Sequence, residues 1–192
     1  IASNISDISG TPQNALTTGG VPLVVAHVDS AAPPGGTGDV LSPFNSLQLG
    51  LGAPADIVFT HAGSTFPAAP DNIITLANDQ SLFGEGVIGF PSGARQVESI
   101  ITLAGLGDLT LPDSPNSAAN VAALGLDPAQ AVLQRPTITN TIGDVVTMGN
   151  NSSFGGFVID GTLLTGNGVT INGVNGASVS DVQISNVGGA GI

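Results

Sequence analysis

The sequence predicts an all-β protein, built as a right-handed parallel β-helix in which successive coils of the chain stack into a solenoid. Three observations support this fold class. Short apolar–polar–apolar segments recur at a step of about 24 residues, as in other solenoids with short repeats. Glycine and proline, 28 and 13 of the 192 residues, interrupt the chain often. Trp, Tyr and Cys are absent, so the core comes from Val, Ile, Leu and a few Phe, a composition that favours short strands.

The repeat is clearest where two segments align without a gap. ITLANDQSL at residues 74–82 matches VTMGNNSSF at residues 146–154, an offset that equals three steps of about 24 residues. VTI at residues 169–171 then repeats VTM at residues 146–148 one further step along the chain. In a strand this pattern places the apolar residues on one face, and stacked coils would bury that face. An antiparallel sandwich, the leading alternative, does not explain the step.

The chain is expected to divide into two parts. Residues 1–55 form an irregular N-terminal segment and cap, rich in Gly, Pro, Ser and Thr, with one strand at about 21–28. Residues 56–192 form the coils, interrupted at about 112–136 by an insertion with short helices. The chain stops where a new strand should start and no polar cap follows, so we expect a stack truncated at its C-terminal end.

Composition excludes several function classes. Fourteen acidic residues face two arginines and no lysine, a net charge of −12 that repels nucleic acid and anionic membrane surfaces. No apolar run approaches the roughly 20 residues of a membrane span. The absence of cysteine excludes disulfides and thiol chemistry. We therefore expect no nucleic-acid partner and no membrane insertion.

No catalytic constellation is found, and we expect no enzyme. β-Helix polysaccharide lyases need a Lys or Arg base, and hydrolases need convergent carboxylates. Lysine is absent, Arg95 follows a Pro-Ser-Gly turn, Arg135 precedes a proline, and no Asp-Asp pair occurs. His27 and His61 lie on candidate strands beside Asp29 and Asp56, and could bind a metal if those strands are neighbours.

Three sets of residues are candidate sites. Asp29 and Asp39 border a glycine-rich loop and could hold calcium, the one cofactor considered. Threonines between apolar residues could form an outward row that binds a glycan or even ice, although β-propensity and a solvated face also explain them. Asparagines after the same strands could stack as a structural ladder. The threonines are Thr75, Thr102, Thr147 and Thr170, and the asparagines are Asn78, Asn150 and Asn172.

An ordered succession of segments resembles large bacterial surface and autotransporter-like proteins with a parallel β-helix passenger region. The segments are GGTGDVLSPFNSL (35–47), DIVFTHAGS (56–64), ITLANDQSLFGEG (74–86), RPTITN (135–140) and GNGVTINGVNGASVSDVQISNVGGAGI (166–192). The resemblance implies export to the cell surface, a capped N-terminal end and a structural or adhesive role, and it supplies no catalytic residues.

We therefore expect a secreted or cell-surface, non-catalytic structural or adhesive protein. It could self-assemble into a fibre or layer, and its partners would be copies of itself, the remainder of a longer chain, or cell-surface glycans. The alternative is a carbohydrate-binding or polysaccharide-cleaving β-helix, such as a polysaccharide lyase or glycoside hydrolase.

Overall fold

The computed structural model describes most of the chain, and its regular secondary structure is nearly all β-strand. The described residues are 5–11, 22–85, 87–90, 93–96, 98–103, 107–112, 132–133, 135–140 and 142–192. They contain one short helix, α1 (Leu47–Leu51). The all-β class predicted from the sequence is confirmed, and most strands pair in parallel within three separate sheets.

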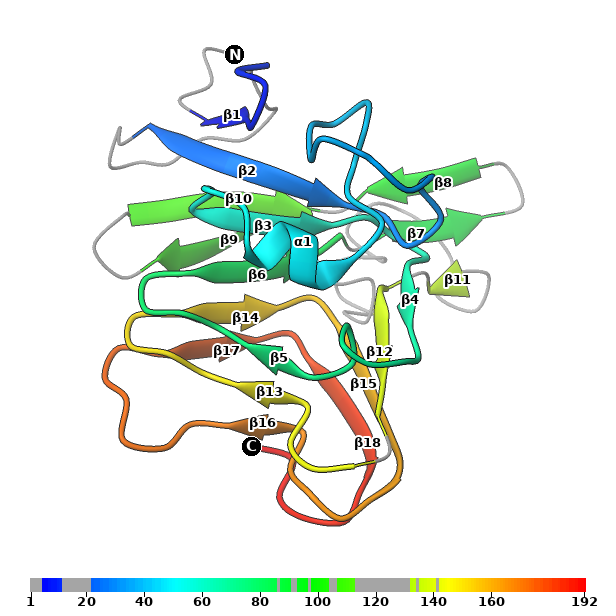
Figure 1. The fold of residues 1–192 in the computed structure, drawn as a ribbon, viewed down its shortest axis with the longest axis vertical. Coiled ribbons are helices and arrows are strands. Elements are labelled where there is room, and N and C mark those ends of the chain that lie inside the picture. Colours follow the sequence, from blue (N-terminus) through cyan, green and yellow to red (C-terminus); the bar gives the residue numbers. More distant parts are fainter. Residues whose placement is uncertain are drawn as a thin grey trace.

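The first sheet has six strands, all parallel, in the order β1-β2-β3-β6-β14-β17. In Figure 1 these strands follow one another from the top of the view downward. Their bounds are β1 (Ile5–Asp7), β2 (Leu23–Val28), β3 (Ile57–Thr60), β6 (Ser81–Gly84), β14 (Ser153–Gly155) and β17 (Ser178–Ser180).

Two further sheets are also parallel. The second has the order β4-β12-β15-β18, and the third has the order β5-β13-β16. The second sheet consists of β4 (Thr65–Phe66), β12 (Thr137–Thr139), β15 (Val158–Leu164) and β18 (Gln183–Val187). The third consists of β5 (Ile74–Thr75), β13 (Val146–Thr147) and β16 (Val169–Thr170).

The chain visits the three sheets in a constant order. It runs from β3 through β4 and β5 to β6, later from β12 through β13 to β14, and then from β15 through β16 and β17 to β18. Ile74 lies opposite Val146, and Val146 lies opposite Val169. The number of residues between two repeated segments in the sequence therefore equals the number of residues between paired positions on neighbouring strands.

Two small antiparallel sheets lie between β6 and β12 in the sequence. One pairs β9 (Glu98–Leu103) with β10 (Gly107–Pro112), and the other places β7 (Val87–Phe90) between β8 (Gly93–Gln96) and β11 (Val132–Leu133). The helical insertion expected at about 112–136 lies mostly outside the described residues. The antiparallel strands upstream of it show that parallel pairing is already interrupted after β6.

Residues before β3 contribute both strands and a covering helix. β1 and β2 continue the six-stranded sheet beyond β3. Ser46 caps α1, which packs against β2 and β3 and lies above β5 in Figure 1. A Cβ on Gly50 would lie 2.6 Å from Val28 and 2.9 Å from Val58, so this close approach requires glycine.

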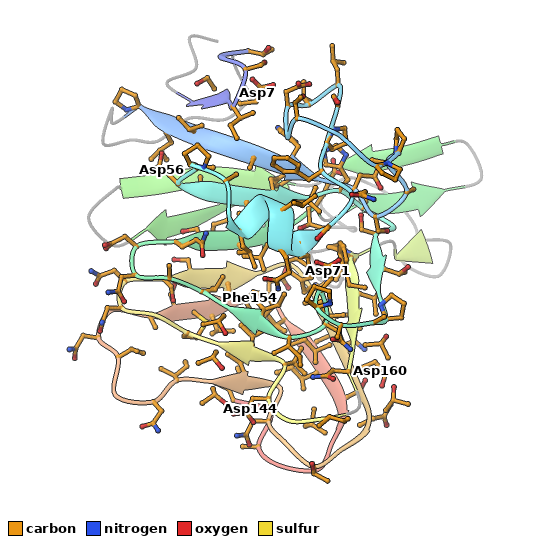
Figure 2. All side chains as sticks on the ribbon, in the orientation of Figure 1. Asp7, Asp56, Asp71, Asp144, Phe154 and Asp160 are labelled. Atoms are coloured by element: carbon orange, nitrogen blue, oxygen red, sulfur yellow. The ribbon has the colours of Figure 1, made fainter. Side chains whose placement is uncertain are left out.

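The apolar core lies between the three parallel sheets. Columns of equivalent residues fill it, for example Ile138 beside Ile159. Phe154, labelled in Figure 2, is fully buried and stacks on Phe157 with ring centroids 5.2 Å apart. Among the described residues, no helix is long and apolar enough to cross a membrane.

Candidate functional site

The third sheet brings three of the four predicted threonines together. Thr75, Thr147 and Thr170 occupy equivalent positions on its three strands. Thr75 and Thr147 are exposed, whereas Thr170 is half-buried and donates its hydroxyl to Asp144 Oδ2 at 2.7 Å. Thr102 lies on β9, which pairs with β10 in a different sheet. The row is therefore three threonines long.

Asparagine side chains connect equivalent turns between the third and first sheets. Asn78 Oδ1 accepts the backbone N–H of Asn150 at 2.9 Å and its side-chain N–H at 3.3 Å. Asn150 Oδ1 in turn accepts the backbone N–H of Asn175 at 2.9 Å. Asn172 is exposed, and Asn175 holds the ladder position that the sequence analysis assigned to Asn172.

A second set of side-chain hydrogen bonds, which sequence reasoning missed, joins the equivalent turns that precede the strands of the third sheet. Asp144, labelled in Figure 2, accepts the backbone N–H of Asn167 through its Oδ1 at 2.8 Å. Asn167 Oδ1 accepts the N–H of Ala190 at 2.9 Å. The hydrogen bond from Asn167, followed by that from Thr170, holds the pKa of Asp144 below its usual range. The constant spacing of Asp144, Asn167 and Ala190 along the chain was the available signal.

Two histidines meet at the ends of β2 and β3. His27 Nδ1 and His61 Nε2 lie 2.9 Å apart, and His61 Nδ1 lies 3.9 Å from Asp29 Oδ2. Both rings contact Phe59 edge-on. Burial, and then the neighbouring His61, lowers the pKa of His27 to about 4, so His27 is neutral at pH 7. Asp56 lies outside this cluster and accepts a backbone N–H of β2 instead.

The two aspartates considered for calcium each hold their own turn. Asp29 Oδ1 accepts the N–H of Ala31 at 2.9 Å. Asp39 accepts the Thr37 hydroxyl at 2.6 Å and two backbone N–H groups of its own turn, and the Thr37 bond leads in lowering the pKa of Asp39. Within the described part of the chain, no group of three or more histidine or acidic side chains is placed to hold a metal ion.

An ion pair between a buried arginine and an exposed aspartate holds the turn between β17 and β18. The Arg135 side chain is 2% exposed, and its Nη2 lies 2.7 Å from Asp181 Oδ1. Its Nη1 donates to the Asp181 carbonyl oxygen at 2.9 Å, so one guanidinium holds both the side chain and the backbone of the turn. Asp181 has a φ of +56°, a left-handed conformation that these two hydrogen bonds from Arg135 stabilise.

The apolar interior reaches the surface at the β16–β18 layer, which comprises β16, β17, β18 and the turns that join them. Leu76 and Met148 are 2% and 3% exposed, but Ile171, which extends their column, is 44% exposed. Val179 and Ile184, next in two other columns, are only partly buried.

The same layer carries unpaired strand edges. Residues 189–191 begin to cover β16, because Gly191 accepts the N–H of Val169 at 2.9 Å. The outer edges of β17 and β18 pair with no strand among the residues that the structure describes. Unpaired backbone groups and incompletely buried apolar side chains therefore lie together at this layer.

No protein-family model, curated protein or solved structure matches the chain.

Proposed function

We propose that this chain is a non-catalytic structural or adhesive protein of the cell exterior, that its three parallel sheets are the sides of a right-handed parallel β-helix, and that copies associate through the β16–β18 layer. The observation that carries the proposal is that incompletely buried apolar side chains, which continue the columns of the core, lie beside the unpaired edges of β17 and β18. The location outside the cell is supported by the resemblance to bacterial surface proteins.

The constant order of the sheets supports the β-helix. Equivalent strands in successive layers pair in register, and side chains such as Asn78 and Asp144 bond equivalent turns. In such a stack each layer is stabilised mainly by its neighbours. A scaffold of this kind suits a structural role because its faces are fixed by backbone pairing over their whole length.

The charge distribution supports a second copy of the chain as the occupant of the β16–β18 layer. Residues 161–192 contain one ionisable side chain, Asp181, which pairs with Arg135, and the carboxylates of Asp144 and Asp160 accept hydrogen bonds from side chains of this layer. A second copy can therefore approach this layer with little of the repulsion that a net charge of −12 causes elsewhere.

The edges themselves favour pairing. β17 and β18 contain no proline and no charged residue, the devices that commonly protect an exposed edge. Two copies of the layer related by a two-fold axis would present the same surface to each other. Their contact would pair the edges and bury Ile171, Val179 and Ile184.

The test is the mass of the chain in solution across a range of concentrations, measured by light scattering, together with negative-stain microscopy. The expected result is association well above the 18.8 kDa monomer. Ile171→Lys places a charge in the layer and should return the chain to a monomer. Leu41→Lys, the same kind of change at a side chain that is 92% exposed in a distant loop, should leave association intact.

Two outcomes would overturn the self-association: a monomer at every concentration, or equal behaviour of the two lysine variants. Melting curves establish that each variant is folded. Should Ile171→Lys fail to fold, Gln183→Lys, on the exposed edge strand β18, brings the same charge into the layer and should also give a monomer.

A further inference from the structure

We propose that Asn172 is a site of spontaneous deamidation in the folded protein, and that the fold protects the chemically identical dipeptide at Asn167. Three Asn-Gly dipeptides occur between residues 167 and 176, beginning at Asn167, Asn172 and Asn175. Because the two-residue sequence is the same in each, any difference in their reactivity comes from the structure around them.

The reaction consumes only water. The backbone nitrogen of the glycine attacks the side-chain Cγ of the asparagine, and a new C–N bond closes a five-membered succinimide. The side-chain nitrogen takes up the proton and leaves as ammonia. Water then opens the ring at either carbonyl, which gives aspartate or isoaspartate. Glycine favours the attack, because it has no Cβ to shield its nitrogen and it allows the backbone to turn.

At Asn167 both reacting groups are engaged. The side-chain oxygen accepts the N–H of Ala190 at 2.9 Å, and the side-chain nitrogen donates to the Thr170 hydroxyl at 3.4 Å. The attacking nitrogen, that of Gly168, donates to the carbonyl oxygen of Ala190 at 3.1 Å. All three hydrogen bonds must open before the ring can close, so this dipeptide is protected.

At Asn172 the reacting groups are free. The side chain is exposed, and none of the hydrogen bonds of the described residues involves it or the N–H of Gly173. Gly173 has a φ of +69° and no heavy atom within 4 Å of the position of a Cβ. Neither packing nor hydrogen bonding opposes the rotation that brings the Gly173 nitrogen onto the Asn172 side chain.

Asn175 is intermediate. Its side chain is exposed, but its backbone N–H belongs to the ladder with Asn150. A Cβ on Gly176 would lie 2.4 Å from Asn151 Oδ1, so this turn is packed against the layer above. Ring closure here must disturb the ladder, and the expected order of conversion is Asn172, then Asn175, then Asn167.

The experiment incubates the full chain at slightly alkaline pH, folded in buffer and, in parallel, unfolded in denaturant. Because no Lys or Arg follows Arg135, a non-tryptic digest and site-resolving fragmentation in a mass spectrometer are needed to follow each asparagine. In denaturant we expect similar rates at the three sites. In the folded chain we expect Asn172 to stay within a few-fold of its denatured rate, whereas three hydrogen bonds should slow Asn167 by about tenfold or more.

The control is Asn172→Gln, in which ring closure would have to form a larger and slower ring. This variant should lose the fast component of conversion while Asn167 and Asn175 keep their rates. The inference is overturned if folding slows Asn172 as much as Asn167, if Asn167 converts first, or if the fast component persists in Asn172→Gln.

Discussion

Asn150 donates its backbone N–H to the side-chain oxygen of Asn78 at 2.9 Å, although the two residues are 72 positions apart in the sequence. The side-chain oxygen of Asn150 in turn accepts the backbone N–H of Asn175. The neighbouring strands β5 and β13 are only two residues long and make few ladder bonds of their own. The bonded turns therefore contribute a large part of what fixes the register of the stack.

Asn150→Ala should destabilise the protein by about 1–2 kcal/mol, because it leaves the N–H of Asn175 without its acceptor and removes the side-chain bond to Asn78. Asn172→Ala is the matched control, since its side chain bonds to nothing in the described structure, and it should change stability by less than about 0.5 kcal/mol. Urea denaturation measures both. Equal effects would show that the ladder does not stabilise the fold.

Asp181→Asn should also destabilise the protein, by about 1–2 kcal/mol, because it removes the charge that pairs with the buried Arg135 while solvent around Asp181 screens part of the loss. Asp79→Asn is the control. Asp79 shares the left-handed backbone, with a φ of +61°, but its carboxylate accepts from the amide of Asn151. Thermal melting of the two variants distinguishes ion pairing from turn geometry: if they lose the same stability, the arginine has no special role.

The free energy of unfolding should decrease as the pH is lowered from about 6.5 to about 4. His27 takes up a proton near its ordinary pKa of 6.5 when unfolded, but only near 4 when folded. The unfolded state therefore binds more protons in this window, and the free energy of unfolding decreases as the pH drops, by at most about 3 kcal/mol. Above pH 6.5 this contribution is constant.

His27→Gln, which does not titrate, should flatten that slope. Asp7, Asp39, Asp144 and Asp160 all have lowered pKa values, so most of their contribution is lost as the pH falls through and below the ordinary carboxyl pKa of 3.8, and little of it is lost by pH 4.5. Urea midpoints at pH 7 and pH 4.5 give the slope. An unchanged slope in the variant would assign the acid sensitivity to other groups.

The apolar columns could be predicted from the sequence because equivalent strands follow one another at a nearly constant offset. Ile74, Val146 and Val169 share one pattern and one register. The sequence could not show that Asn175 holds the ladder position in place of Asn172. The sequence offset between paired strands changes within that layer, because β14 and β17 are farther apart in the sequence than β13 and β16. The additional residues lie in the turn, and they move the ladder to Asn175.

Other features leave no trace in a local pattern. Thr102 has apolar neighbours like the other threonines, but such a segment can equally pair antiparallel, as β9 does. The contact between Arg135 and Asp181 joins distant parts of the chain and depends on how a turn of one layer folds against the next. The meeting of His27 and His61 required knowing that β2 and β3 are neighbours.

The central claim, that distant segments stack in register, is tested most directly by a disulfide. The chain has no cysteine, so Thr75→Cys with Thr147→Cys introduces the only pair. The two positions are exposed and opposite each other on neighbouring strands, which lie about 4.8 Å apart, within the span of a disulfide. The control combines Thr75→Cys with Thr102→Cys, which are closer in sequence and would close more readily in an unstructured chain. We predict that mild oxidation cross-links the first pair quantitatively and the control pair poorly, as read on a non-reducing gel. Faster disulfide formation in the control pair, or no disulfide in the first pair, would contradict the claim that these strands lie side by side in register.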